Sequence, residues 1–175
     1  SKISSTNTIG LDTEFVRIRT YYPKLCLVQI SSNSGTGCID CLQRNNLNKV
    51  WQLIFNPNKL KIFHSARQDL EILFLIKSQI PENIFDTQIA AALLGYPPQV
   101  GIKQLLKAEL NIEISKTETR SDWSKRPLDL KQIEYALEDV NHLLNLHNAL
   151  KNKLKDKERY LWAMEDSSRI LTCYR

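Results

Sequence analysis

The order of apolar segments in the first half of the chain restricts the folds that it can adopt. Three segments near the start are rich in Ile, Leu and Val, at residues 8–16, 23–31 and 36–41. The SNSGTG segment between the second and the third is typical of a tight turn. Strands joined by short turns pair with their neighbours, so we expect these three to form an antiparallel meander.

The pattern then changes to strands that alternate with helices. Residues 60–66 and 83–87 have the composition of short strands, and helical patterns occupy residues 46–55, 67–79 and 88–96. Strands separated by helices pair in parallel through crossover connections. The sequence therefore predicts an α/β fold with a mixed sheet, an antiparallel meander followed by parallel strands, flanked by helices.

The second half of the chain is predicted to be helical. We expect helices at about 101–110, 129–152 and 157–171. The apolar face of the middle helix follows the i, i+3, i+4, i+7 rule and consists of Ile133, Ala136, Leu137, Val140, Leu143, Leu144 and His147. The polar segment 115–130 is predicted to be irregular, either as a functional loop or as an open surface loop.

Composition fits one globular domain without membrane spans. Of the 175 residues, 42% are hydrophobic and 25% are charged, which is ordinary for globular proteins. We therefore expect residues 1–175 to form a single domain. The densest apolar run, LEILFLI at 70–76, is far shorter than the ~18 residues of a membrane span. Without a basic-then-apolar leader, a cytoplasmic location and no membrane partner are expected.

The net charge of +5 favours a polyanionic partner such as nucleic acid. The charge is uneven, because KNKLKDKER (151–159) holds five basic and two acidic residues. This segment is either a solvated helix end or a contact for nucleic-acid phosphates. No apolar stripe in the sequence points to a dimer, and we expect no obligate protein partner.

The cysteines are Cys26, Cys38, Cys41 and Cys173. The CIDC segment at 38–41 has the spacing of zinc and redox sites, but a structural zinc site needs a second pair of ligands. A redox motif normally opens a helix, whereas this one closes a predicted strand. We expect all four cysteines to be reduced, structural thiols.

Two acidic residues interrupt the first predicted strand. In IGLDTEF (9–15), Asp12 and Glu14 are two positions apart, so their side chains point to the same face. Carboxylates placed side by side repel each other, and burial disfavours their charged forms. The pair is therefore out of place in a purely structural strand.

Two further acids lie on predicted helices. Asp69 occupies the first turn of the helix at 67–79, where it either points inward or serves only the helix dipole. Asp139 follows Tyr135 by four residues, which places both on one side of their helix, at the border of its apolar face. That pair is either a contact at the rim of the core or part of a site.

Together, these elements supply four carboxylates that a mixed sheet can bring together: Asp12, Glu14, Asp69 and Asp139. Each unpaired buried charge costs several kcal/mol. Two divalent cations would neutralise them, and Mg²⁺ and Mn²⁺ prefer oxygen ligands. Two such ions about 4 Å apart assist in-line phosphoryl displacement. In a basic protein, this combination points to phosphodiester hydrolysis.

The same residues resemble the motifs of a known family. LDTEF with Asp12 and Glu14, HSARQDLEIL with Asp69, and EYALEDV with Tyr135 and Asp139 are similar to the three motifs of the DEDDy 3′→5′ exonucleases. Longer segments resemble the ribonuclease D branch of that family, namely LDTEFVRIRTYYPKLCLVQI (11–30), FDTQIAAALLGYP (85–97) and TRSDWSKRPL (119–128).

The resemblance covers about residues 9–165 and implies a ribonuclease H-like fold. It implies two divalent cations, Mg²⁺ or Mn²⁺, and a tyrosine that orients the attacking water. The implied metal ligands are Asp12, Glu14, Asp69 and Asp139, and the implied tyrosine is Tyr135. The implied activity is the trimming of RNA 3′ ends, as in tRNA precursors, with release of nucleoside 5′-monophosphates.

The resemblance also suggests residues that contact the terminal nucleotide. Thr13 and Phe15 are candidates, although Phe15 is equally suited to core packing. His64, just before the second motif, either approaches the substrate or has a structural role. Family members of this branch usually continue into helical HRDC domains, and we expect none within residues 1–175.

Two other functions compete with an exoribonuclease. One is a DNA-directed exonuclease of the same superfamily, as in the Werner-type enzymes. The other is a nucleic-acid-binding module that retains the fold without activity. The presence of all four carboxylates and of Tyr135 favours an active enzyme.

Overall fold

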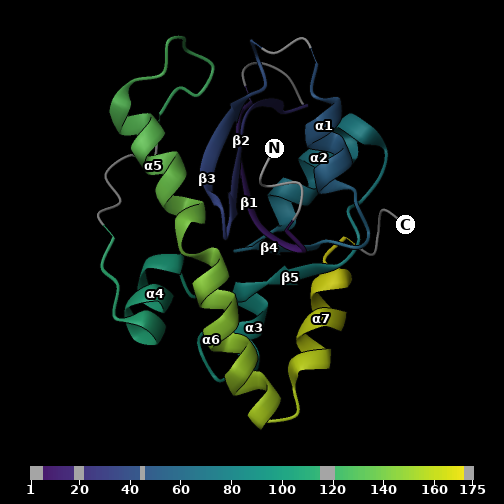
Figure 1. Cartoon of the computed structure of the whole chain (residues 1–175), viewed down its shortest axis with the longest axis vertical. Coiled ribbons are helices and arrows are strands. Elements are labelled where there is room, and N and C mark those ends of the chain that lie inside the picture. The colour runs from purple at the N-terminus through teal and green to yellow at the C-terminus, as the bar shows by residue number, and fades with distance from the viewer. Residues whose placement is uncertain (1–5, 18–21, 44–45, 115–120, 172–175) are drawn as a thin grey trace.

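The computed structural model describes residues 6–17, 22–43, 46–114 and 121–171. Its centre is a five-stranded sheet with the strand order β3-β2-β1-β4-β5 (Figure 1). The strands are β1 (Thr8–Val16), β2 (Lys24–Ser32), β3 (Gly35–Asp40), β4 (Leu60–Phe63) and β5 (Ile84–Asp86). β1, β2 and β3 pair antiparallel, whereas β1 with β4 and β4 with β5 pair parallel. The predicted mixed sheet is confirmed.

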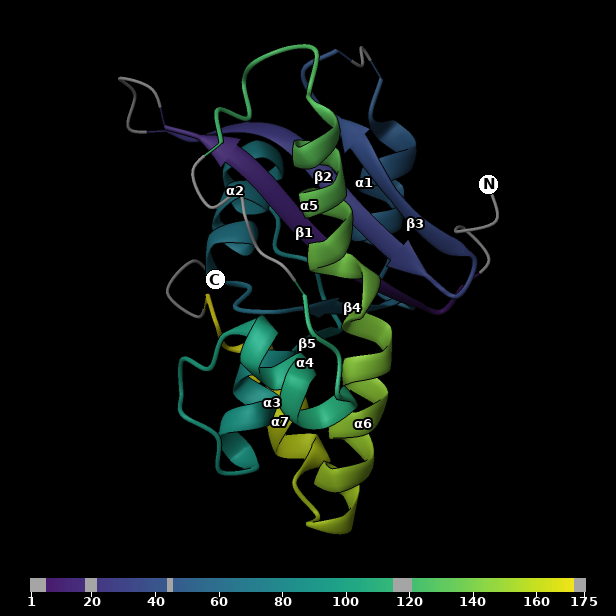
Figure 2. The same ribbon diagram turned by 90° about the vertical axis from the view of Figure 1, so that its left-hand side faces the viewer.

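The helices cover both faces and one end of this sheet. They are α1 (Asn48–Ile54), α2 (Arg67–Lys77), α3 (Thr87–Leu93), α4 (Ile102–Leu110), α5 (Leu130–Asn141), α6 (Leu143–Asp156) and α7 (Tyr160–Ser168). α1 and α2 lie on one face of the sheet, and α5 lies across the other (Figures 1 and 2). The remaining helices gather beside β4 and β5, where α6 packs against α3 and α4.

The helix predicted at 129–152 is wrong as a single helix, because the chain turns at His142 between α5 and α6. The apolar periodicity continues through the turn: Val140, Leu143 and Leu146 belong to one buried cluster. The two halves nevertheless have different neighbours, since α5 covers β1 to β3 and α6 packs against α3 and α4. Periodicity within a helix reports which side is buried and not whether the axis bends.

Several predicted boundaries extend too far. The strand expected at 60–66 ends at Phe63, and Ser65 takes a positive φ of 63° before α2 begins. The strand expected at 83–87 is confined to Ile84–Asp86, after Asn83 with φ 53°. Asp86 then caps α3 by accepting a hydrogen bond from the Gln88 N–H at 2.8 Å. These turns depend on backbone conformations that apolar patterns do not reveal.

The cysteines that the structure describes are free thiols, as predicted: Cys26, Cys38 and Cys41. Burial raises the pKa of Cys38 to about 11 and that of Cys41 to about 12. Raised pKa values are the opposite of what reactive thiols need. Cys173 and residues 115–120 of the predicted loop lie outside the described residues.

Among the helices of the described part, none is long and apolar enough to cross a membrane.

Candidate metal centre and active site

Acidic side chains from β1 and α5 meet on the α5 side of the sheet. Asp12 and Glu14 alternate along β1 with residues that pack toward α1 and α2, such as Leu11. They therefore face α5, which carries Asp139. Carboxylate oxygens of Asp12, Glu14 and Asp139 lie within 4.8 Å of one another. Three of the four carboxylates predicted from the sequence thus form one cluster.

Asp69 reaches the same region from the other side of β1. β1 pairs with β4 only from Thr8 to Gly10, so the rest of that edge is open to the first turn of α2. There Asp69 is 6% exposed, and its Oδ1 accepts a hydrogen bond from the Thr13 hydroxyl at 2.6 Å. The inward orientation that the sequence left open is therefore observed.

Burial raises the pKa values of two of these carboxylates, and repulsion between the carboxylates adds to the shift at Asp12. The pKa of Asp12 is raised well above its ordinary value, mainly by burial and then by the charges of Asp69, Asp139 and Glu14. Burial also raises the pKa of Asp69 to about 7, although the hydrogen bond from Thr13 opposes this shift. A divalent cation would reverse this penalty, because an opposite charge favours the ionised form. The donor atoms are carboxylate oxygens, which suit Mg²⁺ or Mn²⁺.

A cavity of about 390 Å³ opens beside this cluster. Its walls come from β1, from the start of α2, from α4 and α5, and from the segment before α5. The lining residues are Leu11, Asp12, Thr13, Glu14, Phe15, His64, Gln68, Ile102, Ser121, Trp123, Tyr135, Asp139 and Leu143. Asp69 is not among these residues, and its Oδ1 accepts a hydrogen bond from Thr13, which does line the cavity. The carboxylate cluster and Tyr135 therefore line the same cavity.

The residues predicted to contact the substrate all line this cavity, but each also has a structural contact. The Thr13 hydroxyl is engaged with Asp69. Phe15 packs against the cluster between the sheet and α1 and α2. The two ring nitrogens of His64 lie 2.9 Å from Thr87 Oγ1 and 3.1 Å from the Val100 carbonyl oxygen. Their roles in substrate binding stay predictions.

Asp86 is a residue whose importance the sequence did not reveal. It is 2% exposed, and its carboxylate accepts hydrogen bonds from the N–H groups of Ser65 at 3.1 Å and Ala66 at 2.8 Å. Ala66 is the N-cap residue of α2, so Asp86 holds the turn that delivers Asp69. An acidic residue between a strand and a helix was the available signal, but its partners lie about 20 positions away.

Comparison with known proteins shows the family of this fold. Residues 1–155 match the 3′–5′ exonuclease family. Ribonuclease D from Zymomonas mobilis is 40% identical over 172 residues, which is 97% of this chain and 44% of that protein. The chain therefore spans less than half the length of this curated relative.

Three solved structures, which come from two proteins, are similar over 99% of the chain. Escherichia coli RNase D, described as an exoribonuclease involved in structured RNA processing, superposes with a TM-score of 0.93 at 31% identity over 46% of its own chain. Brucella melitensis NrnC with bound Mg²⁺ gives a TM-score of 0.86 at 27% identity over 86% of its chain. The structure of NrnC bound to pGG gives a TM-score of 0.87 at 28% identity over 85% of its chain. The resemblance inferred from the motifs is confirmed, and the chain belongs to the 3′–5′ exonuclease family.

Proposed function

We propose that this chain is the catalytic domain of a metal-dependent 3′→5′ exoribonuclease. The observation that carries the proposal is the cluster of Asp12, Glu14 and Asp139 in the wall of a cavity of about 390 Å³. The similarity to ribonuclease D favours RNA as the substrate. We infer that it acts in the cytoplasm on RNA 3′ ends, as in tRNA precursors, without an obligate protein partner, and releases nucleoside 5′-monophosphates.

Two divalent cations fit the donor set of this site. One would be held by Asp12, Glu14 and Asp139, and the other by Asp12 and Asp69. When bound, such ions acidify water and stabilise negative charge on the leaving oxygen. The Thr13 hydroxyl would orient Asp69, because it already donates a hydrogen bond to one carboxylate oxygen. The Mg²⁺ complex of Brucella melitensis NrnC supports a metal role in a related fold.

Tyr135 would orient the attacking water. A phenol is protonated at neutral pH, so its hydroxyl can donate or accept a hydrogen bond but is a poor base. Tyr135 lines the same cavity as the carboxylates and precedes Asp139 by one turn of α5. Thr13, Phe15 and His64 also line this cavity, and we infer that they would contact the terminal nucleotide.

The proposal is tested by incubating the chain with 5′-labelled RNA and Mn²⁺ or Mg²⁺. We expect a ladder that shortens from the 3′ end, release of 5′-mononucleotides, and no cleavage in chelator. Asp12→Asn should lower the rate by at least about 100-fold, because it removes charge from both proposed ion sites. Glu165→Gln changes an exposed carboxylate of α7 and should retain the rate. If no RNA tested gave metal-dependent release of mononucleotides, the proposed exoribonuclease activity would be refuted.

A DNA-directed exonuclease remains the second candidate, because the cluster and cavity suit any phosphodiester. Cleavage of RNA and of DNA with the same sequence separates the two. Equal or faster cleavage of DNA would contradict the RNA assignment. Binding of RNA without any cleavage would instead favour an inactive nucleic-acid-binding module.

A further inference from the structure

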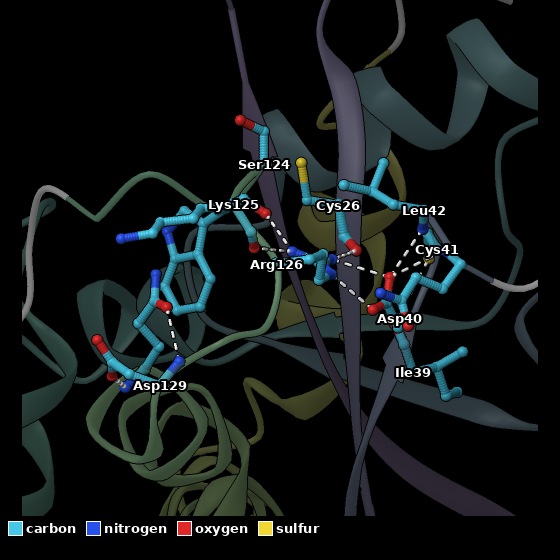
Figure 3. Close-up of polar contacts among 12 residues, drawn as sticks. Cys26, Ile39, Asp40, Cys41, Leu42, Ser124, Lys125, Arg126 and Asp129 are labelled. Atoms are coloured by element: carbon cyan, nitrogen blue, oxygen red, sulfur yellow. Dashed lines mark hydrogen bonds and ion pairs between the residues drawn. The ribbon is translucent and has the colours of Figure 1, made fainter.

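A segment of loop connects the cavity wall to α5, and one arginine holds it against the sheet. Arg126 Nε and Nη2 donate to the two carboxylate oxygens of Asp40 at the end of β3, at 2.6 and 2.8 Å. Nη2 also donates to the Cys26 carbonyl of β2 at 3.1 Å. Figure 3 shows the guanidinium between the loop and these two strands. We call this group of contacts the Arg126 clamp.

The same guanidinium also fixes its own loop. Arg126 Nη1 donates to the main-chain carbonyls of Trp123 at 2.8 Å and Lys125 at 2.7 Å. The side chains of Arg126 and Asp40 are only 14% and 26% exposed. The hydrogen bonds from Arg126 hold the pKa of Asp40 below its usual value. Two parallel charge-assisted bonds give geometric precision that an exposed ion pair lacks.

The clamp acts on the cavity wall through Trp123. Trp123 is 6% exposed, and it packs in one cluster with Leu27 and Ala136. Its ring centroid lies 6.1 Å from that of Tyr135, and both residues line the cavity. Because Arg126 donates a hydrogen bond to the Trp123 carbonyl, displacement of Arg126 would remove one restraint on the main chain that carries the ring beside Tyr135.

The loop is also attached to the start of the helix that bears Tyr135. The Asp129 side chain accepts from the Gln132 N–H at 2.8 Å, and Gln132 Oε1 accepts from the Asp129 N–H at 3.1 Å. This capping box starts α5 three residues after Arg126. Tyr135 is thus held at its ring by Trp123 and along its helix by the end of the clamped loop.

We propose that Arg126 and Asp40 are positioning residues that keep Tyr135 in place for hydrolysis. This inference rests on the proposed function, and it adds a specific role for a contact between residues 86 positions apart. A merely structural clamp would change stability alone. A positioning clamp would change the step that depends on Tyr135.

The first test is the rate of RNA trimming at saturating Mn²⁺ in Arg126→Lys and Asp40→Asn. Lysine cannot reproduce the two-pronged contact with the carboxylate. We expect each variant to lower kcat about tenfold, since small displacements of a reacting group are costly. The matched controls are Arg169→Lys and Glu165→Gln, which alter an exposed ion pair on α7 and should leave kcat unchanged.

The second test is a double-mutant cycle with Tyr135→Phe. If the clamp acts through Tyr135, Arg126→Lys should lower kcat less than twofold once the hydroxyl is absent. An equal reduction in both backgrounds, or no reduction with Tyr135 present, would overturn the inference. If Arg126→Lys fails to fold, the same cycle with Asp40→Asn tests whether the clamp acts through Tyr135.

A third measurement separates this inference from the proposed function. In a chain with Trp51→Phe and Trp162→Phe, the emission reports Trp123 alone. We expect Arg126→Lys to shift this emission to the red as the buried ring gains water. An unchanged emission would contradict the proposed role of the Arg126 clamp, whether or not the chain is active. An inactive wild-type chain would refute the proposed function, and the emission would still test the clamp.

Discussion

The pKa values of two titratable residues, Asp12 and His147, are shifted in opposite directions. Around Asp12, burial and neighbouring carboxylates favour the neutral form of an acid. At His147, which lies on α6 outside the proposed site, burial and the charge of Lys151 lower the pKa to about 4. His147 is 3% exposed and meets the edge of Phe85 with ring centroids 4.7 Å apart. Both shifts make stability depend on pH, because each pKa differs from its value in the unfolded chain.

We predict that acid destabilises the fold partly through His147. Its folded pKa of about 4 lies below the ordinary 6.5, so the unfolded chain binds the extra proton first. The contribution of neutral His147 is complete above pH 6.5 and is lost as the pH falls toward 4. Between pH 7 and 4, the free energy of unfolding of His147→Gln should fall by up to about 3 kcal/mol less than that of the wild type. Urea unfolding at each pH measures this difference, and parallel curves would contradict it.

At the scale of elements, the site depends on how two βα turns are joined. Asp86 is the last residue of β5, and its carboxylate accepts hydrogen bonds from N–H groups at the start of both α2 and α3. Its own N–H donates to Ser167 Oγ on α7 at 2.9 Å. The first turn of α2, which carries Asp69, is therefore tied to the neighbouring strand and not only to its own sequence.

We predict that Asp86→Ala lowers the free energy of unfolding by about 3 kcal/mol. The substitution leaves the buried N–H of Ala66 without its acceptor and removes the cap of α3. Thermal unfolding should show a decrease of about 6–12 °C for a chain of this size. Asp166→Ala, on the exposed surface of α7, is the control and should change the midpoint little.

The start of α6 lies close to β1, directly after the turn at His142. A Cβ at Gly10 would collide with Ser31 Oγ and lie 3.1 Å from the Cβ of Leu143. Leu143 is the first residue of α6, directly after the turn at His142. Glycine thus permits the start of α6 to approach β1 closely, while α5 continues over the meander.

At the scale of the whole molecule, metal binding should couple the separate elements of the site. Asp12 and Glu14 come from β1, Asp69 from α2 and Asp139 from α5. An ion held by residues from these elements would bind the folded chain in preference to the unfolded one. It should therefore raise stability by mass action.

We predict that saturating Mn²⁺ raises the unfolding midpoint of the wild type by several degrees relative to chelator. An ion at 100 times its dissociation constant contributes about 2.7 kcal/mol. Without metal, Asp12→Asn should be more stable than the wild type, because it removes one of the repelling carboxylates. It should also gain little from Mn²⁺. A shift as large as in the wild type would show that the ion binds elsewhere.

Local patterns in the sequence determined much of this architecture. Apolar segments, turn signals and helical periodicity identified the meander, the alternating strands and helices, and the buried side of α5 and α6. The spacing of two positions between Asp12 and Glu14 in one strand placed both side chains on one face. These features were predictable because each depends on residues within a few positions of one another.

Only the tertiary structure decided how those elements meet. It placed Asp139 beside Asp12 and Glu14, but set Asp69 against Thr13, 56 positions away. It bent the predicted long helix at His142 and joined Arg126 to Asp40. Each of these contacts joins distant residues or depends on which surface a helix covers, and sequence periodicity carries neither kind of information.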